Sequence, residues 1–187
     1  MLKKRELIGQ ENHILFELMV HPEVFPFVRH KAYSHDEFLF LTKKTIEAEE
    51  QGKLISRTII DEWSNPIGTI NLYDIENGAG FLGTWIGKAY HGKGYNKLAK
   101  EVFFNEVFYE LGIETIFMRI RKENIRSIKA AEKLPYTIKA NESRKSIFEQ
   151  INAKNYIYDL YEISKDLYSL YIMRQQSIQD ETQALEA

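Results

Sequence analysis

Residues 80–111, GFLGTWIGKAYHGKGYNKLAKEVFFNEVFYEL, decide the fold of this chain. The segment FLGTWI is rich in aromatic, apolar and β-branched residues and predicts a strand. Residues 96–111 follow a helical pattern, which Gly112 is expected to end as a C-terminal cap. Between them lies a turn that contains Gly92 and Gly94. A strand, a glycine turn and a helix leave backbone N–H groups free at the positive end of the helix, so the segment predicts a phosphate-binding turn.

Two common phosphate motifs fit this turn poorly. Gly87, Gly92 and Lys93 have the spacing of a P-loop, but Gly94 stands where that motif needs a hydroxyl for a magnesium ion. Gly92 and Gly94 also fit the start of a Rossmann fingerprint, but its third glycine is replaced by Lys97, whose long side chain would keep helix and strand apart. A plain glycine-rich turn without a ligand is the remaining simple interpretation.

The turn resembles the pyrophosphate loop of the GNAT N-acetyltransferases, [RQ]-x-x-G-x-[GA], with Ala89 in place of the first polar residue. A predicted strand at residues 114–120 is followed by NIRSIKAAEKLPY at residues 124–136. This segment resembles N-x-x-S-x-x-x-x-E-K-x-G-[FY] of the same family, with Pro135 where glycine is usual. The run WIGKAYHGKGY is similar to the branch of ribosomal-protein N-terminal acetyltransferases and spermidine acetyltransferases. The resemblance extends, more weakly, from residue 2 to about residue 167.

Composition is ordinary for a globular protein. The chain has 187 residues, 44% hydrophobic and 28% charged, with a net charge of −2. This length suits one domain, and the charge gives no reason to expect a nucleic-acid partner. The absence of cysteine excludes disulfides, thiolate metal sites and a cysteine nucleophile. No apolar run approaches the ~20 residues of a membrane span, and no signal peptide is recognisable, so we expect a cytoplasmic protein without a membrane partner.

The remaining elements follow from periodicity and turn residues. We expect helices over residues 11–19 and from Ser34 to about Gly52, the second with a Ser34–Glu37 capping box. Expected strands are residues 2–8, 54–61, 67–75, 143–148 and 155–163. The predicted fold class is α+β of the GNAT type: a mixed, mostly antiparallel sheet with a splayed central parallel strand pair and helices on both faces.

The sequence becomes more polar beyond Ser164. We expect the acetyltransferase domain to cover residues 1–167 and a polar C-terminal extension to cover residues 168–187, partly helical from a Ser164 cap and frayed at its end. The apolar stripe of this extension could pack on its own domain or on a second subunit in a homodimer.

The resemblance implies acetyl-CoA as donor, an amine as acceptor and direct transfer without a metal ion. Residues 85–87 match the strand whose backbone binds the pantetheine arm and the thioester carbonyl, and residues 91–96 match the pyrophosphate loop. The expected cofactor-binding residues are Trp85, Ile86, Gly87, His91, Gly92, Lys93, Gly94, Tyr95, Asn96, Asn124 and Ser127.

The resemblance also implies two catalytic residues. Asn124 matches the asparagine that contacts the pantetheine arm, although it is an equally good helix N-cap. Ser127 lies one turn further on and could donate a proton to the departing thiolate, or it could be an ordinary first-turn serine. Many relatives use a tyrosine where this chain has Ala131. Tyr136 is expected to belong to the core.

The general base is less well defined. Asp74 and Glu76 follow a predicted strand and could reach the amine, or they could be a solvated turn pair. Glu149 and His35 are further candidates. Many relatives use only water and backbone carbonyls for this step.

The resemblance implies that the acceptor is a protein N-terminus, a polyamine or another small amine. Carboxylates at residues 36, 37, 74 and 76 would suit a cationic acceptor. The alternative is a catalytically idle acetyl-CoA-binding module that regulates a partner, a reading favoured by the departures at Ala89, Ala131 and Pro135.

Overall fold

The computed structural model describes residues 1–153 and 156–186, and the chain divides into two compact units, Met1–Ile113 and Glu114–Ala187. Among the described residues the strand order along the sheet is β1-β2-β3-β4-β5-β7-β6, and β4 and β5 form its one parallel pair. The predicted class, a mixed and mostly antiparallel α+β sheet, is therefore confirmed. The proposed boundary at residue 167 stays a prediction.

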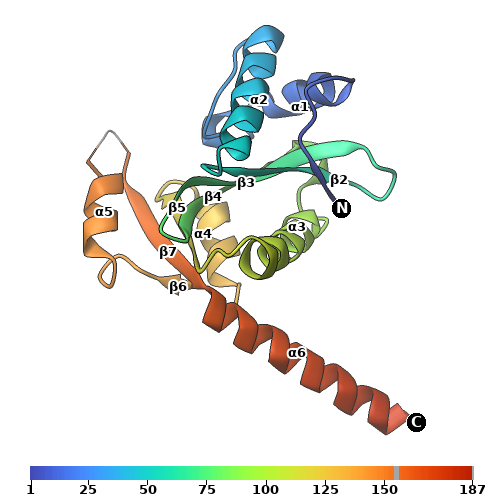
Figure 1. Ribbon diagram of the computed structural model, residues 1–187, viewed down its shortest axis with the longest axis vertical. Coiled ribbons are helices and arrows are strands. Elements are labelled where there is room, and N and C mark those ends of the chain that lie inside the picture. Colours follow the sequence, from blue (N-terminus) through green and yellow to red (C-terminus); the bar gives the residue numbers. More distant parts are fainter. Residues whose placement is uncertain (154–155, 187) are drawn as a thin grey trace. The chain divides into compact units, whose positions relative to one another are not determined.

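The first unit contains four antiparallel strands. They are β1 (Leu2–Lys4), β2 (Ile55–Ile60), β3 (Pro66–Glu76) and β4 (Ala79–Ile86). The helices are α1 (Glu11–Met19), α2 (His35–Glu50) and α3 (Tyr95–Asn105), with 3₁₀ turns η1 (Phe25–Phe27) and η2 (Lys88–Tyr90) and a π-helical turn η3 (Glu106–Glu110). Helices α1 and α2 lie on one face of these strands and α3 lies on the other (Figure 1).

The register of β3 and β4 places Ile70 opposite Thr84 and Leu72 opposite Leu82. Ile70 and Leu72 are fully buried, as expected for the central strand of a covered sheet. A separate core forms beneath α1 and α2. Its buried members are Leu15, Met19, Val24, Val28, Ala32 and Phe38.

Several predicted boundaries agree with the structure. Ser34 is the N-cap of α2, as predicted, and accepts a hydrogen bond from the Glu37 N–H at 3.2 Å. The Glu37 carboxylate accepts from the Tyr33 N–H rather than from that of Ser34, so only the Ser34 half of the predicted capping box forms. Helix α3 begins at Tyr95, and its last turn widens into η3 before Gly112, which has a φ of +71°. The chain leaves β1 after Lys4 rather than at residue 8, because the Asn12 side-chain amide donates to the carbonyls of Glu6 and Leu7. Those carbonyls are therefore not available to a neighbouring strand.

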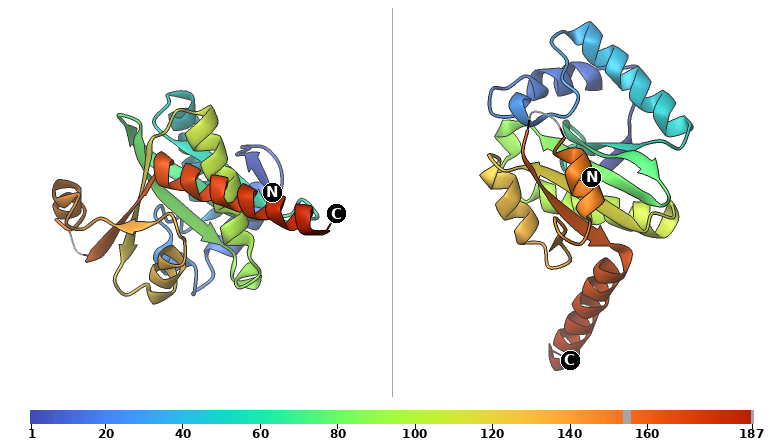
Figure 2. Two further views of the ribbon diagram at one scale, coloured as in Figure 1. Left: turned by 90° about the horizontal axis from the view of Figure 1, so that it is seen from below. Right: turned by 90° about the vertical axis from the view of Figure 1, so that its left-hand side faces the viewer.

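The second unit is built around β7 (Tyr158–Ser164), which is antiparallel to β5 (Thr115–Arg121) and to β6 (Ile138–Lys139). Its helices are α4 (Ile125–Glu132), α5 (Lys145–Ile151) and α6 (Lys165–Glu186). Figure 2 shows α6 leaving the end of β7. The predicted cap is confirmed, because Ser164 Oγ accepts from the Leu167 N–H at 3.3 Å.

The predicted strand over residues 143–148 is wrong, since this segment lies largely in α5. Pairing with β7 ends at Ala140, whose N–H donates to the Leu160 carbonyl at 2.8 Å. The Asn141 side chain then accepts from the Leu160 N–H at 2.8 Å. A side chain thus takes the donor that a longer strand would need. Of the predicted strand 155–163, Asn155 lies outside the described residues.

Asn124 begins α4 as an N-cap, with its side-chain oxygen accepting from the Ser127 N–H at 3.2 Å. The capping interpretation of Asn124 is therefore confirmed. The cofactor contact implied for the same residue stays a prediction.

Replacing Asn124 by Ala removes this cap, and we expect it to lower the free energy of unfolding by about 1 kcal/mol. Asn124→Ser should restore most of the loss, since serine caps about as well as asparagine. Urea unfolding of the three proteins measures both changes. An unchanged midpoint for Asn124→Ala would contradict a stabilising cap.

Lys100 of α3 is 8% exposed, and no described residue forms a hydrogen bond or ion pair with its ammonium group. Burial lowers the pKa of Lys100 to about 8. In an unfolded chain the pKa of lysine is about 10.4, so between these two pKa values the unfolded state binds more protons and stability rises with pH. Below about pH 8 the fold therefore bears the cost of a buried charge.

We expect Lys100→Met to raise the free energy of unfolding at neutral pH, by up to about 3 kcal/mol, and to flatten its rise above pH 8. Lys97→Met is the matched control, because the Lys97 side chain is 66% exposed on the same helix. That variant should change stability by less than about 0.5 kcal/mol. Denaturant unfolding across this pH range tests the prediction, and a destabilised Lys100→Met protein would refute it.

Candidate active site

The turn between η2 and α3 exposes bare backbone. Gly92 and Gly94 have φ values of +77° and +85°, a region that favours glycine, and an added Cβ at either position would meet no atom within 4 Å. No described residue accepts a hydrogen bond from the N–H of Gly92, Lys93 or Gly94. Open space, free donors and the start of α3 coincide here, and this combination suits an anionic ligand.

His91 stabilises this turn from within. Its Nε2 lies 2.8 Å from the carbonyl oxygen of Ile86, the last residue of β4. Because a carbonyl only accepts, Nε2 carries the proton in this contact. The side chain predicted as a cofactor contact therefore ties the turn to the strand that precedes it.

Aromatic residues flank the same turn. The Lys93 ammonium lies 5.5 Å from the ring centre of Tyr90, which packs edge-on against Tyr95. Tyr95 Oη donates to Glu62 Oε2 at 2.5 Å, and this hydrogen bond raises the pKa of Tyr95 to about 12. The contact ties the start of α3 to the β2–β3 turn. Asn96 follows in the first turn of the helix.

The end of β4 is held by β3 and α1. The Gly87 N–H donates to the Ile67 carbonyl at 2.8 Å, so this amide already has a partner. A Cβ on Gly87 would lie 2.8 Å from the side chain of Leu18, which explains why the position has no side chain. Trp85 packs against the core beneath α1 and α2.

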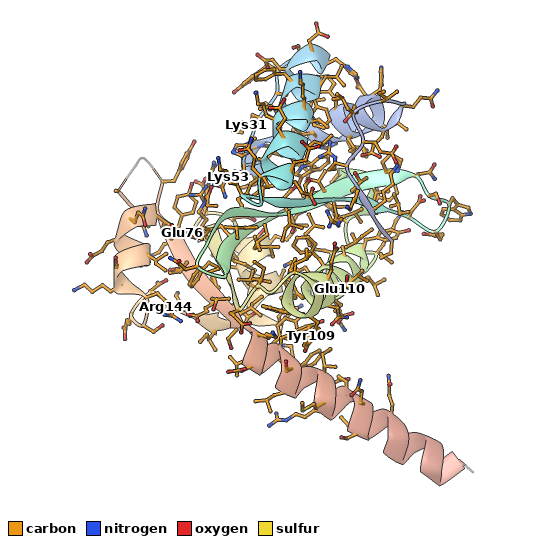
Figure 3. All side chains as sticks on the ribbon, in the orientation of Figure 1. Lys31, Lys53, Glu76, Tyr109, Glu110 and Arg144 are labelled. Atoms are coloured by element: carbon orange, nitrogen blue, oxygen red, sulfur yellow. The ribbon has the colours of Figure 1, made fainter. Side chains whose placement is uncertain are left out.

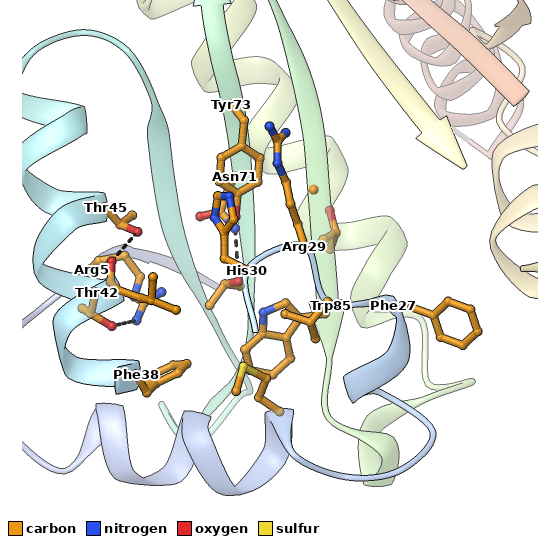
Figure 4. A pocket seen from close by; sticks show the side chains of 16 residues that line it. Arg5, Phe27, Arg29, His30, Phe38, Thr42, Thr45, Asn71, Tyr73 and Trp85 are labelled. Carbon is orange, nitrogen blue, oxygen red and sulfur yellow. Dashed lines mark hydrogen bonds between the residues drawn. The ribbon is translucent and has the colours of Figure 1, made fainter. Parts of the chain in front are cut away.

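A pocket lies in the first unit beside Trp85 (Figure 4). Strand β3 contributes Thr69, Asn71 and Tyr73, which alternate with buried apolar residues. This period of two is visible in the sequence and could have marked one face of β3 as a site. The full lining is Arg5, Met19, Phe27, Val28, Arg29, His30, Phe38, Leu41, Thr42, Thr45, Thr69, Asn71, Tyr73, Gly83, Thr84 and Trp85.

Aromatic contacts order the polar side of this pocket. The Arg29 guanidinium lies 4.3 Å from the ring centre of Tyr73, and the His30 ring meets Tyr73 edge-on at 5.1 Å. Burial raises the pKa of Tyr73 to about 12, so its hydroxyl stays protonated and can donate a hydrogen bond. Asn71 donates to Thr69 Oγ1 at 3.2 Å, which orients both side chains.

The carboxylates considered from sequence lie elsewhere. Asp74 pairs with Arg29 at 2.5 Å, and Glu76 ends β3 (Figure 3). Glu149 is an exposed partner of Lys145 at 3.9 Å. None of the three lines the pocket.

The residues near the start of α2 also lie outside the pocket lining. The ring of His35 packs on His13 and Phe16, and its Nε2 is buried without a hydrogen-bond partner among the described residues. Glu37 accepts from the Tyr33 N–H at 2.6 Å, so this carboxylate serves the helix terminus. Asp36 lies in the same first turn.

The second unit carries the other predicted catalytic residues. Ser127 is half-buried in the first turn of α4, directly after the Asn124 cap. Ala131 is buried on the same helix, and Tyr136 is 1% exposed, so the prediction that Tyr136 belongs to the core is confirmed. The chemical roles of Asn124 and Ser127 stay predictions.

The described part of the chain holds no group of three or more histidine, cysteine, aspartate or glutamate side chains that could bind a metal ion. None of its helices is long and apolar enough to cross a bilayer.

Solved structures share this fold. A spermidine N-acetyltransferase from Vibrio cholerae in complex with CoA and spermine matches with a TM-score of 0.69 and 14% identity over 90% of this chain and 96% of that chain. FdhC, a nucleotide-linked sugar GNAT, matches with a TM-score of 0.71 and 16% identity over 94% of this chain and 92% of the FdhC chain. RimL, a ribosomal L7/L12 alpha-N-protein acetyltransferase, matches with a TM-score of 0.67 and 15% identity over 88% of each chain.

Sequence comparisons complete this finding. No curated protein sequence matches the chain significantly. A family model described as the acetyltransferase (GNAT) domain matches residues 6–137, well over half of the chain. The chain therefore belongs to the GNAT acetyltransferase family.

Proposed function

We propose that this protein is an acetyl-CoA-dependent N-acetyltransferase that moves the acetyl group directly to an amine. The observation that carries the proposal is the turn at residues 92–94, where free N–H groups and open space meet the N-terminus of α3. Family membership supports the reaction class. Acetyl-CoA supplies an activated acetyl thioester.

The residues of the turn have distinct tasks in this proposal. The N–H groups of Gly92, Lys93 and Gly94 bind the pyrophosphate oxygens, together with those of Tyr95 and Asn96 at the start of α3. The ammonium of Lys93 attracts the polyanion. Backbone groups of residues 85–87 bind the pantetheine arm and the thioester carbonyl, with Asn124 as a further contact of that arm.

The acceptor amine enters the pocket beside Trp85. It must lose a proton before it attacks, and the described lining contains one imidazole, His30, and no carboxylate. An imidazole can accept a proton near neutral pH. We therefore assign proton removal to His30, directly or through water, in place of Asp74 and Glu76.

A pair of glycine variants tests cofactor binding. Gly94 and Gly112 both have positive φ, and neither has an atom within 4 Å of an added Cβ, so alanine imposes a similar backbone strain at each. We expect Gly94→Ala to weaken CoA binding about tenfold or more, because it crowds the helix N-terminus and disfavours the turn. Gly112→Ala should leave CoA affinity unchanged.

Isothermal titration of CoA into the three proteins measures this difference, with unfolding midpoints as a check on strain. Equal CoA affinity in Gly94→Ala and the parent protein would overturn the proposed site. CoA binding without acetylation of any amine in a broad panel would favour the alternative of an idle CoA-binding module.

Ser127 is proposed to donate a hydrogen bond to the departing CoA thiolate, which then takes its proton from water. A contact made chiefly in the transition state lowers kcat with little change in KM. We expect Ser127→Ala to lose about tenfold or more in kcat with an unchanged KM for acetyl-CoA. Tyr136→Phe is the control and should retain its kcat, since Tyr136 lies in the core. Steady-state kinetics with a good acceptor measure both constants. An unchanged kcat in Ser127→Ala would show that Ser127 does not assist departure of the thiolate.

A further inference from the structure

The charged side chains that line the pocket beside Trp85 are all cationic in its described lining. Its described lining includes the guanidinium groups of Arg5 and Arg29 but no aspartate or glutamate. A polyamine would bring additional cations toward these groups, and like charges repel strongly where water is scarce. The lining thus disfavours the cationic acceptor that the surface carboxylates suggested from sequence.

Arg29 has unused binding capacity. Its Nη2 pairs with Asp74, while Nη1 is buried and has no hydrogen-bond partner among the described residues. A buried charged donor without a partner is costly, and an oxygen anion of a ligand would remove that cost. The flat guanidinium, fixed against the ring of Tyr73, offers two parallel N–H groups that match a carboxylate or phosphate.

Arg5 also lines the pocket, on the side opposite Arg29, and adds a second positive charge (Figure 4). Its Nη2 donates to Thr42 at 3.0 Å and Asn12 at 3.3 Å, and its Nε has no hydrogen-bond partner within the described part of the chain. Glu11 lies 3.5 Å from Nε but pairs more closely with Lys3, at 2.6 Å. The charge of Arg5 is therefore only partly offset. Thr84 Oγ1, also in the lining, is buried and has no hydrogen-bond partner among the described residues.

We propose that the acceptor is an amine that also carries an anionic oxygen group, a carboxylate or a phosphate, which Arg29 binds in the pocket beside Trp85. This inference rests on the proposed acetyltransferase function and names its substrate class. Arg5 contributes to the attraction without direct contact. The protein thereby selects against polyamines.

Asp74 would compete with an anionic acceptor for the guanidinium group of Arg29. Its side chain is 59% exposed, so this ion pair faces water and is weakly stabilising. An anionic acceptor can share the guanidinium or displace Asp74. Removal of the Asp74 charge should therefore strengthen binding of the acceptor.

Matched acceptor pairs test the proposal. Initial rates of CoA release are measured for amino acids against their amides, for phosphoethanolamine against ethanolamine, and for spermidine. We expect kcat/KM to be at least about tenfold higher for the anionic member of one pair, since a charge-assisted contact is worth about that factor. The amino-acid and phosphoethanolamine arms distinguish carboxylate from phosphate.

Variants of the pocket connect this preference to Arg29. Arg29→Gln should lose about tenfold in kcat/KM for the anionic acceptor and little for its neutral analogue. Arg29→Lys should keep part of the preference, and Asp74→Asn should lower KM. Lys31→Gln is the matched control, because Lys31 is close in sequence but does not line the pocket. Binding of the anionic acceptor to the CoA-bound protein, followed by calorimetry, gives a readout without turnover.

The outcomes separate the two proposals. Failure to bind CoA or to acetylate any amine overturns the proposed function. Acetylation of spermidine or of neutral amines at least as fast as their anionic counterparts overturns only the anionic acceptor. The anionic acceptor is also overturned if the Arg29→Gln protein keeps the parent's preference for anionic amines and binds them with the same affinity.

Discussion

The candidate cofactor site depends on one backbone constraint, the left-handed conformation at Gly92 and Gly94. Any side chain there would add strain, and two such residues let the chain reverse from η2 into α3 while their N–H groups stay free. His91 completes the turn with its contact to the Ile86 carbonyl. The site is therefore made of backbone held in an uncommon shape, and this explains why it needs few reactive side chains.

Helix α3 must stay in place for that turn to work, and both of its ends are tied to the first unit. Tyr95 at its start donates to Glu62. Beyond its end, Glu106 opens the π-helical turn and pairs with Arg57 of β2, which also contacts Glu49 of α2 at 2.6 Å. The Arg57 side chain is only 7% exposed, so these pairs are screened weakly by solvent and rigidly connect two helices to the sheet.

The pocket and the turn differ in the kind of polar group that they present. The turn presents neutral N–H donors, whereas the pocket places guanidinium groups beside aromatic rings. Fixed cations discriminate between acceptors through repulsion as well as attraction. Solved structures with this fold include a spermidine N-acetyltransferase, a nucleotide-linked sugar GNAT and a ribosomal alpha-N-protein acetyltransferase, so the fold by itself does not fix the acceptor.

The sequence by itself determined the elements whose signals are local. Glycine spacing, capping residues and periodicity indicated β4, α3 and the caps at Ser34, Asn124 and Ser164, because each depends on neighbours a few residues away. Tertiary structure alone decided where Asn141 ends the pairing of β7, and it assembled the pocket from segments as distant as Arg5 and Trp85. Contacts between distant segments cannot be read from local sequence patterns, so only the folded structure shows that Arg5 and Arg29 line the same pocket.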